Sequence, residues 1–475
     1  MLQTIAPAPL PDTNDAHLSL DDFYLDIFGQ QGTPIYTQIC FCYSIPDNSP
    51  AAYMRINEIL QAGLERLSAS FPWIAGQIVH EPGEGGSGVY KIKYLDDIPK
   101  VVVKDLRTDP TAPTMAQLRE SSFPFRLLDE RVICPRDTLI LPFQETLNVC
   151  LIQTTFINGG LLFTFLGHHA AMDGIGQNQI MNLLNKACRC EPFTDEELEI
   201  GNIPRKDIVP LFPESHQLGT ELNNQLYSVP GGPPPPPPPM SPGGNGKHRS
   251  PSLHWAYYIF SGESLKQLKA AATSSLANGY ISTDDALTAL VWQSVVRARL
   301  QRLRPSERVH LARAIDIRRY LRMPATYPGC GTNMSFHDSI ALHLAGHDLG
   351  TIATNLRASI DPKTSKLGNL TKSYATHLSR TSDKNSINLT ASLDLSKDIM
   401  LSSWSKMNCY DLDFGFGLGN PEAVRRPQFK PVESLFYFMP KKQDGEVAVA
   451  LCLRDEDFEA LNSDEEFIEY GKLAE

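Results

Sequence analysis

A run of seven consecutive prolines divides this chain into two parts of similar length. The run stands within GGPPPPPPPMSPGGNGKHRSPS, residues 231–252. Consecutive prolines form a stiff, extended segment that cannot join a packed core, and the flanking Gly and Ser residues favour a flexible connection. The sequence therefore predicts an exposed crossover over residues 216–252. It would join two folding units, over 18–215 and 253–475, that follow a loose Pro-rich leader at 1–17.

The length and composition agree with two globular units. The chain has 475 residues, and a single hydrophobic core stops growing beyond about 250–300 residues. Its net charge of -11 argues against a nucleic-acid-binding protein, which would carry a basic face. No apolar run approaches the roughly 18 residues of a membrane-spanning helix. We therefore expect neither a nucleic-acid nor a membrane partner, and a monomeric protein.

The cysteines indicate a reducing compartment. There are nine of them, an odd number scattered over the chain, and the N-terminus lacks the apolar core of a signal peptide. This pattern predicts free thiols and a cytoplasmic protein. A metal site is not expected, because Cys188 and Cys190 do not have zinc-knuckle spacing and nothing near His343 and His347 supplies a third ligand.

Hydrophobic periodicity predicts a mixture of strands and helices in both parts, and so an α/β fold. Strands are expected over residues 35–43, 148–157, 161–166, 254–260, 309–317 and 446–453. Helices are expected over residues 51–70, 175–188, 265–272 and 286–300, with one acidic amphipathic helix over 454–470. Ser282 followed three residues later by Asp285 is a helix-capping signal.

The stretch FTFLGHHAAMDGIGQ, residues 163–177, is the leading candidate for a catalytic site. It places His168 and His169 at the end of an apolar strand, with Asp173 and Gly174 before the next helix. Strand ends can present side chains into a cleft while rigid elements hold them. A neutral imidazole can accept a proton near pH 7. Two histidines packed inside an interface would fit the spacing equally well, so both interpretations stay open at this point.

Other motifs offer weaker chemistry. No serine lies in the G-x-S-x-G pattern of a serine hydrolase. The Gly-rich residues 84–88 lack the Lys of a phosphate-binding loop and predict a turn. The stretch DFGFGLGNP, residues 413–421, has glycines that permit unusual backbone angles, and a tight structural loop is its simplest interpretation.

Five blocks of this chain resemble, in order, the motifs of the BAHD-type acyltransferases. Residues 169–174 match the family's H-x-x-x-D-G motif, and residues 413–417 resemble D-F-G-W-G with Phe in the Trp position. Residues 71–77, 315–318 and 402–404 resemble three further blocks. Within that family the chain is similar to the fungal enzymes that acetylate trichothecenes.

The resemblance implies a fold and a reaction. The fold would be chloramphenicol-acetyltransferase-like, with two similar domains of mixed β-sheet flanked by helices and an active site at the domain interface. The reaction would be O-acetylation, with acetyl-CoA as co-substrate, no metal, and a trichothecene or related polycyclic terpenoid alcohol as the small-molecule acceptor. Acetylation of a toxin's hydroxyl would serve either its biosynthesis or detoxification.

The resemblance also implies roles for individual residues. His169 would be the general base, with His168 packed beside it. Asp173 would pair with Arg318 and fix the loop that carries His169. The remaining implied residues are Gly174, Asp413, Gly415 and Gly417 as structural support, Ser402 or Ser403 as donors to the oxyanion, and Lys266 and Lys269 as contacts of the CoA phosphates.

Three alternatives stay open at the level of the sequence. Residues 168–174 also spell H-H-x-x-x-D-G, the motif of condensation-type enzymes that form amides between carrier-bound substrates. The absence of a carrier domain and the presence of DFGFG favour the acyltransferase. A catalytically silent binding protein of the same fold is disfavoured by the intact His169. Another fungal secondary-metabolite alcohol would require only different pocket side chains.

Overall fold

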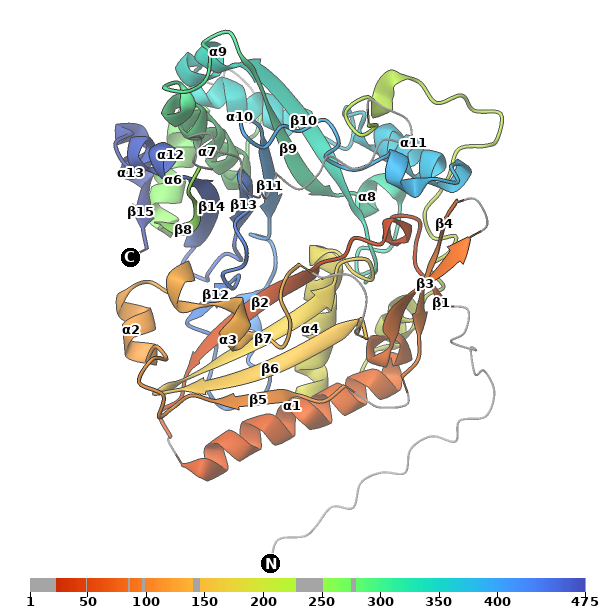
Figure 1. Cartoon of the computed structure of the whole chain (residues 1–475), viewed down its shortest axis with the longest axis vertical. Helices are drawn as coiled ribbons and strands as arrows, with labels where there is room; N and C mark the ends of the chain where they lie inside the picture. Colours follow the sequence, from red (N-terminus) through yellow and green to blue (C-terminus); the bar gives the residue numbers. More distant parts are fainter. Residues whose placement is uncertain are drawn as a thin grey trace, which may run out of the picture.

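Two large β-sheets, each covered by helices, dominate the fold (Figure 1). The computed structural model describes residues 23–47, 49–83, 86–95, 99–139, 146–227, 251–274 and 279–474. The predicted leader, residues 228–250 of the predicted crossover and two residues of the Gly-rich turn at 84–88 lie outside this part of the chain. The α/β fold class predicted from the sequence is confirmed.

The first sheet has five strands in the order β12-β2-β7-β6-β5. Their bounds are β12 (Ala423–Arg425), β2 (Tyr36–Ser44), β7 (Gly160–His168), β6 (Cys150–Ile157) and β5 (Val102–Asp105). β6 and β7 form the hairpin that the sequence predicts, and its turn uses Gly159 with φ +75°, a conformation that glycine adopts without steric cost. This hairpin sets the position at which β7 ends, and so the position of the two histidines.

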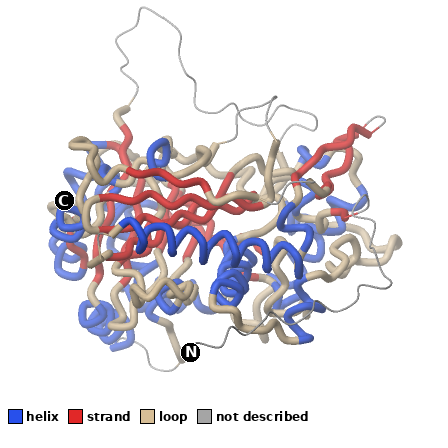
Figure 2. The backbone as a smooth tube through the Cα atoms, turned by 90° about the horizontal axis from the view of Figure 1, so that it is seen from below, coloured by secondary structure: helices blue, strands red, loops and turns tan. Residues whose placement is uncertain are grey.

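Helices cover both faces of this sheet. On one face lie α1 (Pro50–Ser70) and α4 (Gly174–Cys188), which contact each other. On the other lie α2 (Met115–Glu120) and α3 (Glu130–Ile133). In Figure 2, which is seen from below, the long helix α1 crosses in front of the strands. Coverage on both faces explains why β2 and β7 are almost wholly buried and read as continuous apolar runs.

The second sheet has seven strands in the order β10-β9-β11-β13-β14-β8-β15. Their bounds are β10 (Thr332–Ile340), β9 (Arg308–Asp316), β11 (Ile399–Ser403), β13 (Leu435–Phe438), β14 (Val447–Arg454), β8 (Leu253–Phe260) and β15 (Gly471–Leu473). Six helices cover one face: α6 (Gly262–Ser274), α7 (Thr283–Arg299), α9 (Ala341–Gly346), α10 (Leu349–Ala358), α12 (Asp455–Leu461) and α13 (Glu465–Tyr470). The predicted capping box of Ser282 and Asp285 starts α7.

A small third sheet and three further helices lie beside the two large sheets. The small sheet has the order β1-β4-β3, with β1 (Phe23–Tyr24), β4 (Gly86–Lys93) and β3 (Gln77–Gly83). The helices are α5 (Asp195–Gly201), α8 (Arg318–Leu321) and α11 (Leu367–Arg380). α8 follows β9 directly, and this places Arg318 close to the end of the second sheet.

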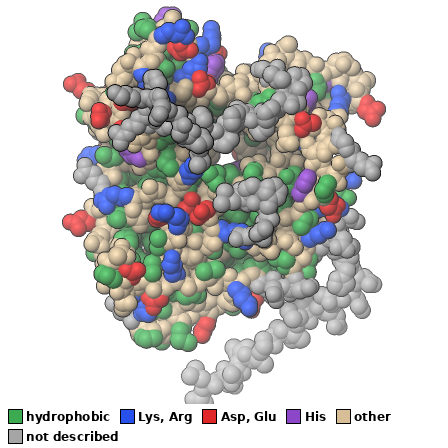
Figure 3. Space-filling model, in the orientation of Figure 1, with side chains coloured by type: hydrophobic (Ala, Val, Ile, Leu, Met, Phe, Trp, Pro, Cys, Tyr) green, Lys and Arg blue, Asp and Glu red, His purple; other side chains and the backbone are tan. Residues whose placement is uncertain are grey.

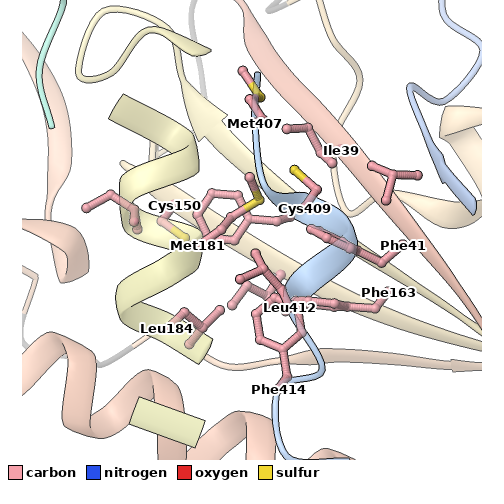
Figure 4. Close-up of a cluster of buried hydrophobic side chains, with 14 of the residues drawn as sticks. Ile39, Phe41, Cys150, Phe163, Met181, Leu184, Met407, Cys409, Leu412 and Phe414 are labelled. Carbon is pink, nitrogen blue, oxygen red and sulfur yellow. The ribbon is translucent and has the colours of Figure 1, made fainter. Parts of the chain in front are cut away.

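The uncovered face of the second sheet packs against the N-terminal half. Tyr257 of β8 stacks on Phe125, with ring centroids 4.0 Å apart, and Tyr437 of β13 belongs to the same hydrophobic cluster as the first sheet. Residues 407–414 extend this contact. Their side chains insert between β2, β7 and α4, as Figure 4 shows for Met407, Cys409, Leu412 and Phe414. Both halves of the sequence therefore share one core.

The predicted strands and helices are found, with one error among them. The acidic segment 454–470 forms two helices, α12 and α13, instead of one. Asp464 interrupts it, because its carboxylate accepts a hydrogen bond from the Phe467 N–H and caps the start of α13. His347 lies beyond the end of α9, so His343 and His347 do not share that helix. The domain boundaries stay a prediction, although β12, from the C-terminal half, is a strand of the first sheet.

On the face seen in Figure 3, acidic and basic side chains are interspersed. Among the helices that the structure describes, none combines the length and the apolar character needed to cross a membrane.

Candidate active site

The two histidines occupy the last residue of β7 and the residue after it. The His168 N–H donates to the Val149 carbonyl at 3.0 Å, and the His169 N–H donates to the Ile35 carbonyl at 2.9 Å. Strands on both sides therefore fix the backbone of this dipeptide. Because successive side chains of a strand point to opposite faces, the two rings meet different surroundings.

His168 is a buried structural residue. Its side chain is 1% exposed, and its ring lies edge-on to Tyr36 with centroids 5.3 Å apart. Its Nδ1 accepts a hydrogen bond from the Ala170 N–H at 3.2 Å, so the proton of the neutral ring is on Nε2. Burial, helped by the neighbouring His169, lowers the pKa of His168 to about 3. The ring therefore stays neutral near pH 7 and braces the loop.

His169 has the features of a general base. It is partly exposed, unlike the residues on either side of it. Burial lowers the pKa of His169 below 6.5, and this effect outweighs the opposing charge of Asp173, while Arg426 lowers the pKa further. Interaction of the ring with its own backbone carbonyl favours the protonated form and so raises the pKa of His169, but it does not offset burial. The imidazole is therefore neutral at pH 7, as a base must be before it accepts a proton.

Asp173 anchors the loop and is saturated with hydrogen bonds. It caps the start of α4, where its carboxylate accepts the Gly176 N–H at 2.8 Å. The Arg318 guanidinium donates two hydrogen bonds to it, at 2.8 and 3.1 Å. The Gly331 N–H and the Thr332 hydroxyl add two more, at 2.7 and 2.9 Å. Burial raises the pKa of Asp173, but Arg318 and these donors hold it below its usual range.

Gly174 contributes space at the start of α4. Its φ is outside the left-handed region, so the backbone conformation does not require a glycine here. A Cβ at this position would lie 2.8 Å from Met407 Cε and 3.5 Å from Trp404 Nε1. The glycine therefore allows residues of the C-terminal half to approach the histidine loop.

A second set of contacts holds the carbonyl groups of the same loop. Arg205, 2% exposed, donates from Nη1 to the Ala171 carbonyl at 2.6 Å. The Cys330 thiol lies 3.3 Å from the His169 carbonyl oxygen and donates to it. The Cys330 N–H in turn donates to buried Asp26 at 2.9 Å. The loop is thus held by side chains from three distant segments.

The structure separates the two candidate oxyanion donors. Because they are adjacent on β11, Ser402 and Ser403 point to opposite faces of the sheet. The Ser403 hydroxyl donates to the carboxylate of Asp284. Ser402 instead accepts a hydrogen bond from Trp404 Nε1 at 3.1 Å, which leaves its own O–H available as a donor. Since Trp404 adjoins Gly174, Ser402 is the serine on the side of the histidine loop.

The DFGFG segment lies at the opposite end of α4. Asp413 accepts two hydrogen bonds from Arg189 Nη1, both at 2.9 Å, and one from the Gly415 N–H at 3.0 Å. Gly415 and Gly417 have φ of +69° and +77°, which only glycine adopts readily. Arg189 follows the last residue of α4, about 20 Å along the helix from Asp173. These residues are therefore remote from His169 along α4.

The two candidate lysines lie on the exposed face of α6. Lys266 is paired with Glu263 at 3.9 Å, and its side chain is 78% exposed. Lys269 lies over the ring of Tyr280, with Nζ 5.0 Å from the centroid, and Arg357 approaches the same ring at 5.5 Å. α6 packs against α7, α10 and α13, and no contact between described residues joins it to the histidine loop. A metal site was not expected either, and the described residues contain no cluster of three or more His, Cys, Asp or Glu side chains that could hold an ion.

Several residues of the site carry no signal in the sequence. Arg205 and Asp26 are single charged residues in irregular segments, and only the folded chain shows that they are buried against the loop. Cys330 looks like one more scattered thiol. Gly176 faces the carbonyl of Pro328, which a Cβ would approach to 2.2 Å. A second glycine two residues after Gly174 was the one hint of this close approach.

Two family models match the chain. Residues 35–188 match the trichothecene 3-O-acetyltransferase-like N-terminal domain, and residues 138–468 match the transferase family. Among curated proteins, an O-acetyltransferase of Cryptosporiopsis sp. (strain 8999) is 48% identical over 95% of this chain and 97% of its own length. A trichothecene 3-O-acetyltransferase of Fusarium sporotrichioides is 44% identical, again over 95% of this chain and 97% of its own length.

Solved structures show the same relationship. The crystal structure of the F. sporotrichioides enzyme TRI101 complexed with coenzyme A and T-2 aligns with a TM-score of 0.87 and 43% identity, over 96% of this chain and 100% of that chain. Vinorine synthase aligns with a TM-score of 0.62 over 98% of this chain and 95% of that chain, at 14% identity, and shows the shared fold. The chain therefore belongs to the transferase family and is a CoA-dependent acyltransferase of the BAHD type.

Proposed function

We propose that this enzyme transfers the acetyl group of acetyl-CoA to a hydroxyl of a trichothecene or a related polycyclic terpenoid. The observation that carries the proposal is the state of His169, a partly exposed imidazole whose lowered pKa keeps it neutral at the end of β7. Full-length similarity to trichothecene 3-O-acetyltransferases supports the choice of substrates, because a relative of this kind was crystallised with coenzyme A and T-2.

His169 would act first as a base and then as an acid. Its imidazole accepts the proton of the acceptor hydroxyl while that oxygen attacks the carbonyl carbon of the thioester. The tetrahedral intermediate collapses, the C–S bond breaks, and the protonated imidazole returns its proton to the CoA thiolate. Proton transfer by a positioned side chain contributes roughly 10²–10⁴-fold. The lowered pKa of His169 keeps the base unprotonated before the reaction.

Ser402 is the better of the two serines for the oxyanion. Its hydroxyl hydrogen remains available, because its oxygen already accepts the Trp404 N–H, whereas Ser403 is engaged with Asp284. Removing one donor of an oxyanion hole costs about 10²–10³-fold in kcat. We therefore propose Ser402 as a donor and Ser403 as a structural residue of the second sheet.

The CoA phosphates would meet the cluster of Lys269, Arg357 and Tyr280. Lys269 and Arg357 flank an aromatic ring that is 65% exposed, and such a surface can hold phosphate groups and stack on a base. Arg357 is also paired with Asp285, so Lys269 is the cation with the stronger attraction for a phosphate. Lys266 remains a second candidate, with a nearby carboxylate from Glu263 that reduces its attraction for an anion.

Incubation of the purified enzyme with acetyl-CoA and a panel of terpenoid alcohols tests the proposed function. Mass spectrometry should show the gain of one acetyl group on a trichothecene, with release of free CoA thiol, and the His169→Ala variant should show neither. Acetylation of a different alcohol in the panel would change the proposed acceptor but would leave the proposed acetyl transfer intact. Release of thiol by wild type and His169→Ala at equal rates would refute the role of His169.

A non-trichothecene acceptor is the second candidate. It is favoured by the 48% identity to an O-acetyltransferase whose name specifies no trichothecene. We further propose a monomeric cytosolic enzyme, because all nine cysteines are free and eight are buried. Light scattering after size exclusion would show a mass near 53 kDa for a monomer of 52.7 kDa.

A further inference from the structure

Two adjacent arginines, the last residue of β12 and the residue after it, are both buried but have opposite surroundings. Arg425 is 1% exposed and Arg426 is 2% exposed. The Arg425 guanidinium donates to the backbone carbonyls of Ser122, Phe123 and Val424 at 3.2, 3.3 and 3.1 Å. The Arg426 guanidinium makes no hydrogen bond or ion pair with any described residue, and its Nε is fully buried without a partner.

Aromatic rings surround the Arg426 guanidinium without satisfying its N–H groups. Its centre lies 4.4 Å from the ring centroid of Phe429, 4.7 Å from that of Tyr437 and 5.6 Å from that of Trp404. Ring faces attract a cation, but they are poor substitutes for hydrogen-bond acceptors. A buried charge without a counter-ion destabilises a protein. The cost indicates that a partner arrives at some stage of the enzyme's cycle.

The backbone of Arg426 is held in a fixed position. The Tyr257 hydroxyl accepts the Arg426 N–H at 2.8 Å and donates to the Arg426 carbonyl at 3.0 Å. Both groups are buried at the contact between the two halves. The guanidinium is therefore preorganised, as an electrostatic catalytic group has to be.

The charge lies beside the reacting groups. Trp404, one of the three rings, donates to Ser402 and adjoins Gly174 of the histidine loop. Tyr437, the second ring, is the β13 partner of Ser402 in the sheet register. The Arg426 charge also acts on the imidazole of His169. One aromatic ring, that of Trp404, thus separates the guanidinium from the candidate oxyanion donor, and the charge of the guanidinium reaches the base.

We propose that Arg426 is a further catalytic residue, whose guanidinium stabilises the negative charge that develops on the thioester oxygen. The inference rests on the proposed acetyl transfer. The thioester and the alcohol are both neutral, so no anion is present at the reacting centre before the reaction. When the alcohol oxygen bonds to the carbonyl carbon, the C=O electron pair moves onto oxygen and provides the missing counter-charge. It returns when the C–S bond breaks, and the thiolate takes its proton from His169.

This arrangement meets the requirement for catalysis. Only an interaction that is stronger in the transition state than in the ground state raises kcat. Arg426 fulfils this condition, because it has no anionic partner among the described residues before the reaction and gains one in the transition state. A guanidinium that only packed among the three aromatic rings would interact with them equally in the ground state and in the transition state, and so would not raise kcat.

The Arg426→Gln and Arg425→Gln variants form a matched pair that tests the proposal kinetically. Arg426→Gln should lower kcat about 10²–10³-fold with little change in KM or in melting temperature. Arg425→Gln should lower the melting temperature and leave kcat of the folded enzyme within a few-fold of wild type. A kcat for Arg426→Gln within threefold of wild type would overturn the proposal, as would a loss explained by unfolding.

A binding experiment tests the same charge without turnover. S-carboxymethyl-CoA places a carboxylate one carbon beyond the thioester carbonyl, next to the point where the oxyanion forms, and S-carbamoylmethyl-CoA is its neutral isostere. Calorimetry should show wild type preferring the anion by about tenfold or more, because hydrogen bonds to charged groups are strong. Arg426→Gln should lose this preference while retaining affinity for the neutral analogue. Equal preferences in the two proteins would refute the inference.

The two experiments distinguish failure of this inference from failure of the proposed function. If wild type acetylates none of the alcohols offered, the analogue comparison still measures whether Arg426 receives an anion at the thioester position. If wild type acetylates an alcohol and Arg426→Gln does so equally fast, the acetyltransferase stands and the role of Arg426 falls.

Discussion

Adjacent histidines have different surroundings here because β7 ends between them. His168 points into the core, where its two ring nitrogens have fixed protonation states, whereas His169 reaches a partly exposed position. The end of the strand therefore gives two identical, adjacent residues different surroundings, and we propose different roles for them.

The pH dependence of kcat/KM should report the titration of His169. Burial lowers its pKa below 6.5, and only the neutral ring can accept a proton. The rate should therefore rise with pH, level off, and show its midpoint below pH 6.5. His169→Ala should lose about 10²–10⁴-fold in kcat and keep the melting temperature of wild type. A midpoint above 6.5 would contradict the assignment.

His168 should control stability in acid. Its pKa is about 3 in the folded protein and 6.5 in the unfolded chain, so between these values the unfolded state binds more protons. The contribution of His168 to the free energy of unfolding is therefore complete above pH 6.5. Below that pH it falls by about 1.4 kcal/mol per pH unit. His168→Asn keeps an acceptor for the Ala170 N–H but cannot titrate. Denaturant unfolding should show that wild type loses unfolding free energy between pH 7 and pH 5. The loss in His168→Asn should be smaller by about 2 kcal/mol.

Asp173 should matter for stability as much as for rate. Asp173→Asn removes the buried charge opposite Arg318 and leaves that guanidinium with the partly exposed Asp316 as its ion-pair partner. Breaking a buried pair costs about 3–5 kcal/mol, and a displaced base lowers the rate by about 10²-fold. The melting temperature and kcat should therefore both fall in Asp173→Asn. A normal melting temperature with an inactive enzyme would point to a direct chemical role instead.

The sequence predicts the candidate site residues that stand in motifs better than the single residues that contact them in the folded protein. His169, Asp173 and Arg318 stand in motifs whose order along the chain is informative, and the Asp173–Arg318 pair is present in the structure. Arg205, Cys330 and Arg426 stand in no such pattern. Their meaning depends on burial against distant segments, which no local spacing encodes.

At the scale of elements, α4 is the part that joins the base to the rest of the molecule. The C-terminal half holds both of its ends, through Arg318 at Asp173 and through Asp413 at Arg189. Amide contacts of Asn408 with Asn178 and Asn182 hold its middle. A shift of either half would therefore move the loop that carries His169.

Gly176→Ala and Gly174→Ala should differ sharply, although the glycines are two residues apart. At Gly176 a Cβ would lie 2.2 Å from the Pro328 carbonyl oxygen, so the backbone would have to move. At Gly174 it would meet Met407 Cε at 2.8 Å, the end of a flexible side chain that can turn away. Gly176→Ala should cost about 1–3 kcal/mol of stability and most of the activity, and Gly174→Ala less of both. Equal melting temperatures would show that α4 docks loosely.

Element types were predictable where the periodicity is strong, as in α1 and α7, and where a turn is distinct, as between β6 and β7. The one wrong element, the helix over 454–470, has continuous amphipathic character. Its break depends on the single cap at Asp464, which a pattern of apolar spacing does not register. The three-residue strand β12 was not predicted, because its pairing partner β2 is almost 400 residues away.

At the scale of the molecule, the two halves of the sequence are not independent in structure. One hydrophobic cluster contains Phe41 and Phe163 of the first sheet together with Tyr257 and Tyr437 of the second. The sequence predicts two units from the proline run, but it gives no measure of how much surface they bury against each other. The apolar residues on the uncovered face of the second sheet follow the usual alternation of a strand. This pattern does not show that the N-terminal half covers that face.

Residues 1–227 and 251–475, produced separately, should therefore each fail to reach the native state. The N-terminal fragment would lack β12 and residues 407–414, and Asp173 would lose Arg318, so an apolar face and a buried carboxylate would be left uncovered together. Co-expression should restore a folded complex, since no covalent link is needed for those contacts. Near-UV circular dichroism and acetyl transfer by the mixed fragments would measure this recovery. A native-like spectrum and a cooperative melt for either fragment alone would instead mean that each sheet closes its own core and that the histidine loop is assembled only when the halves dock.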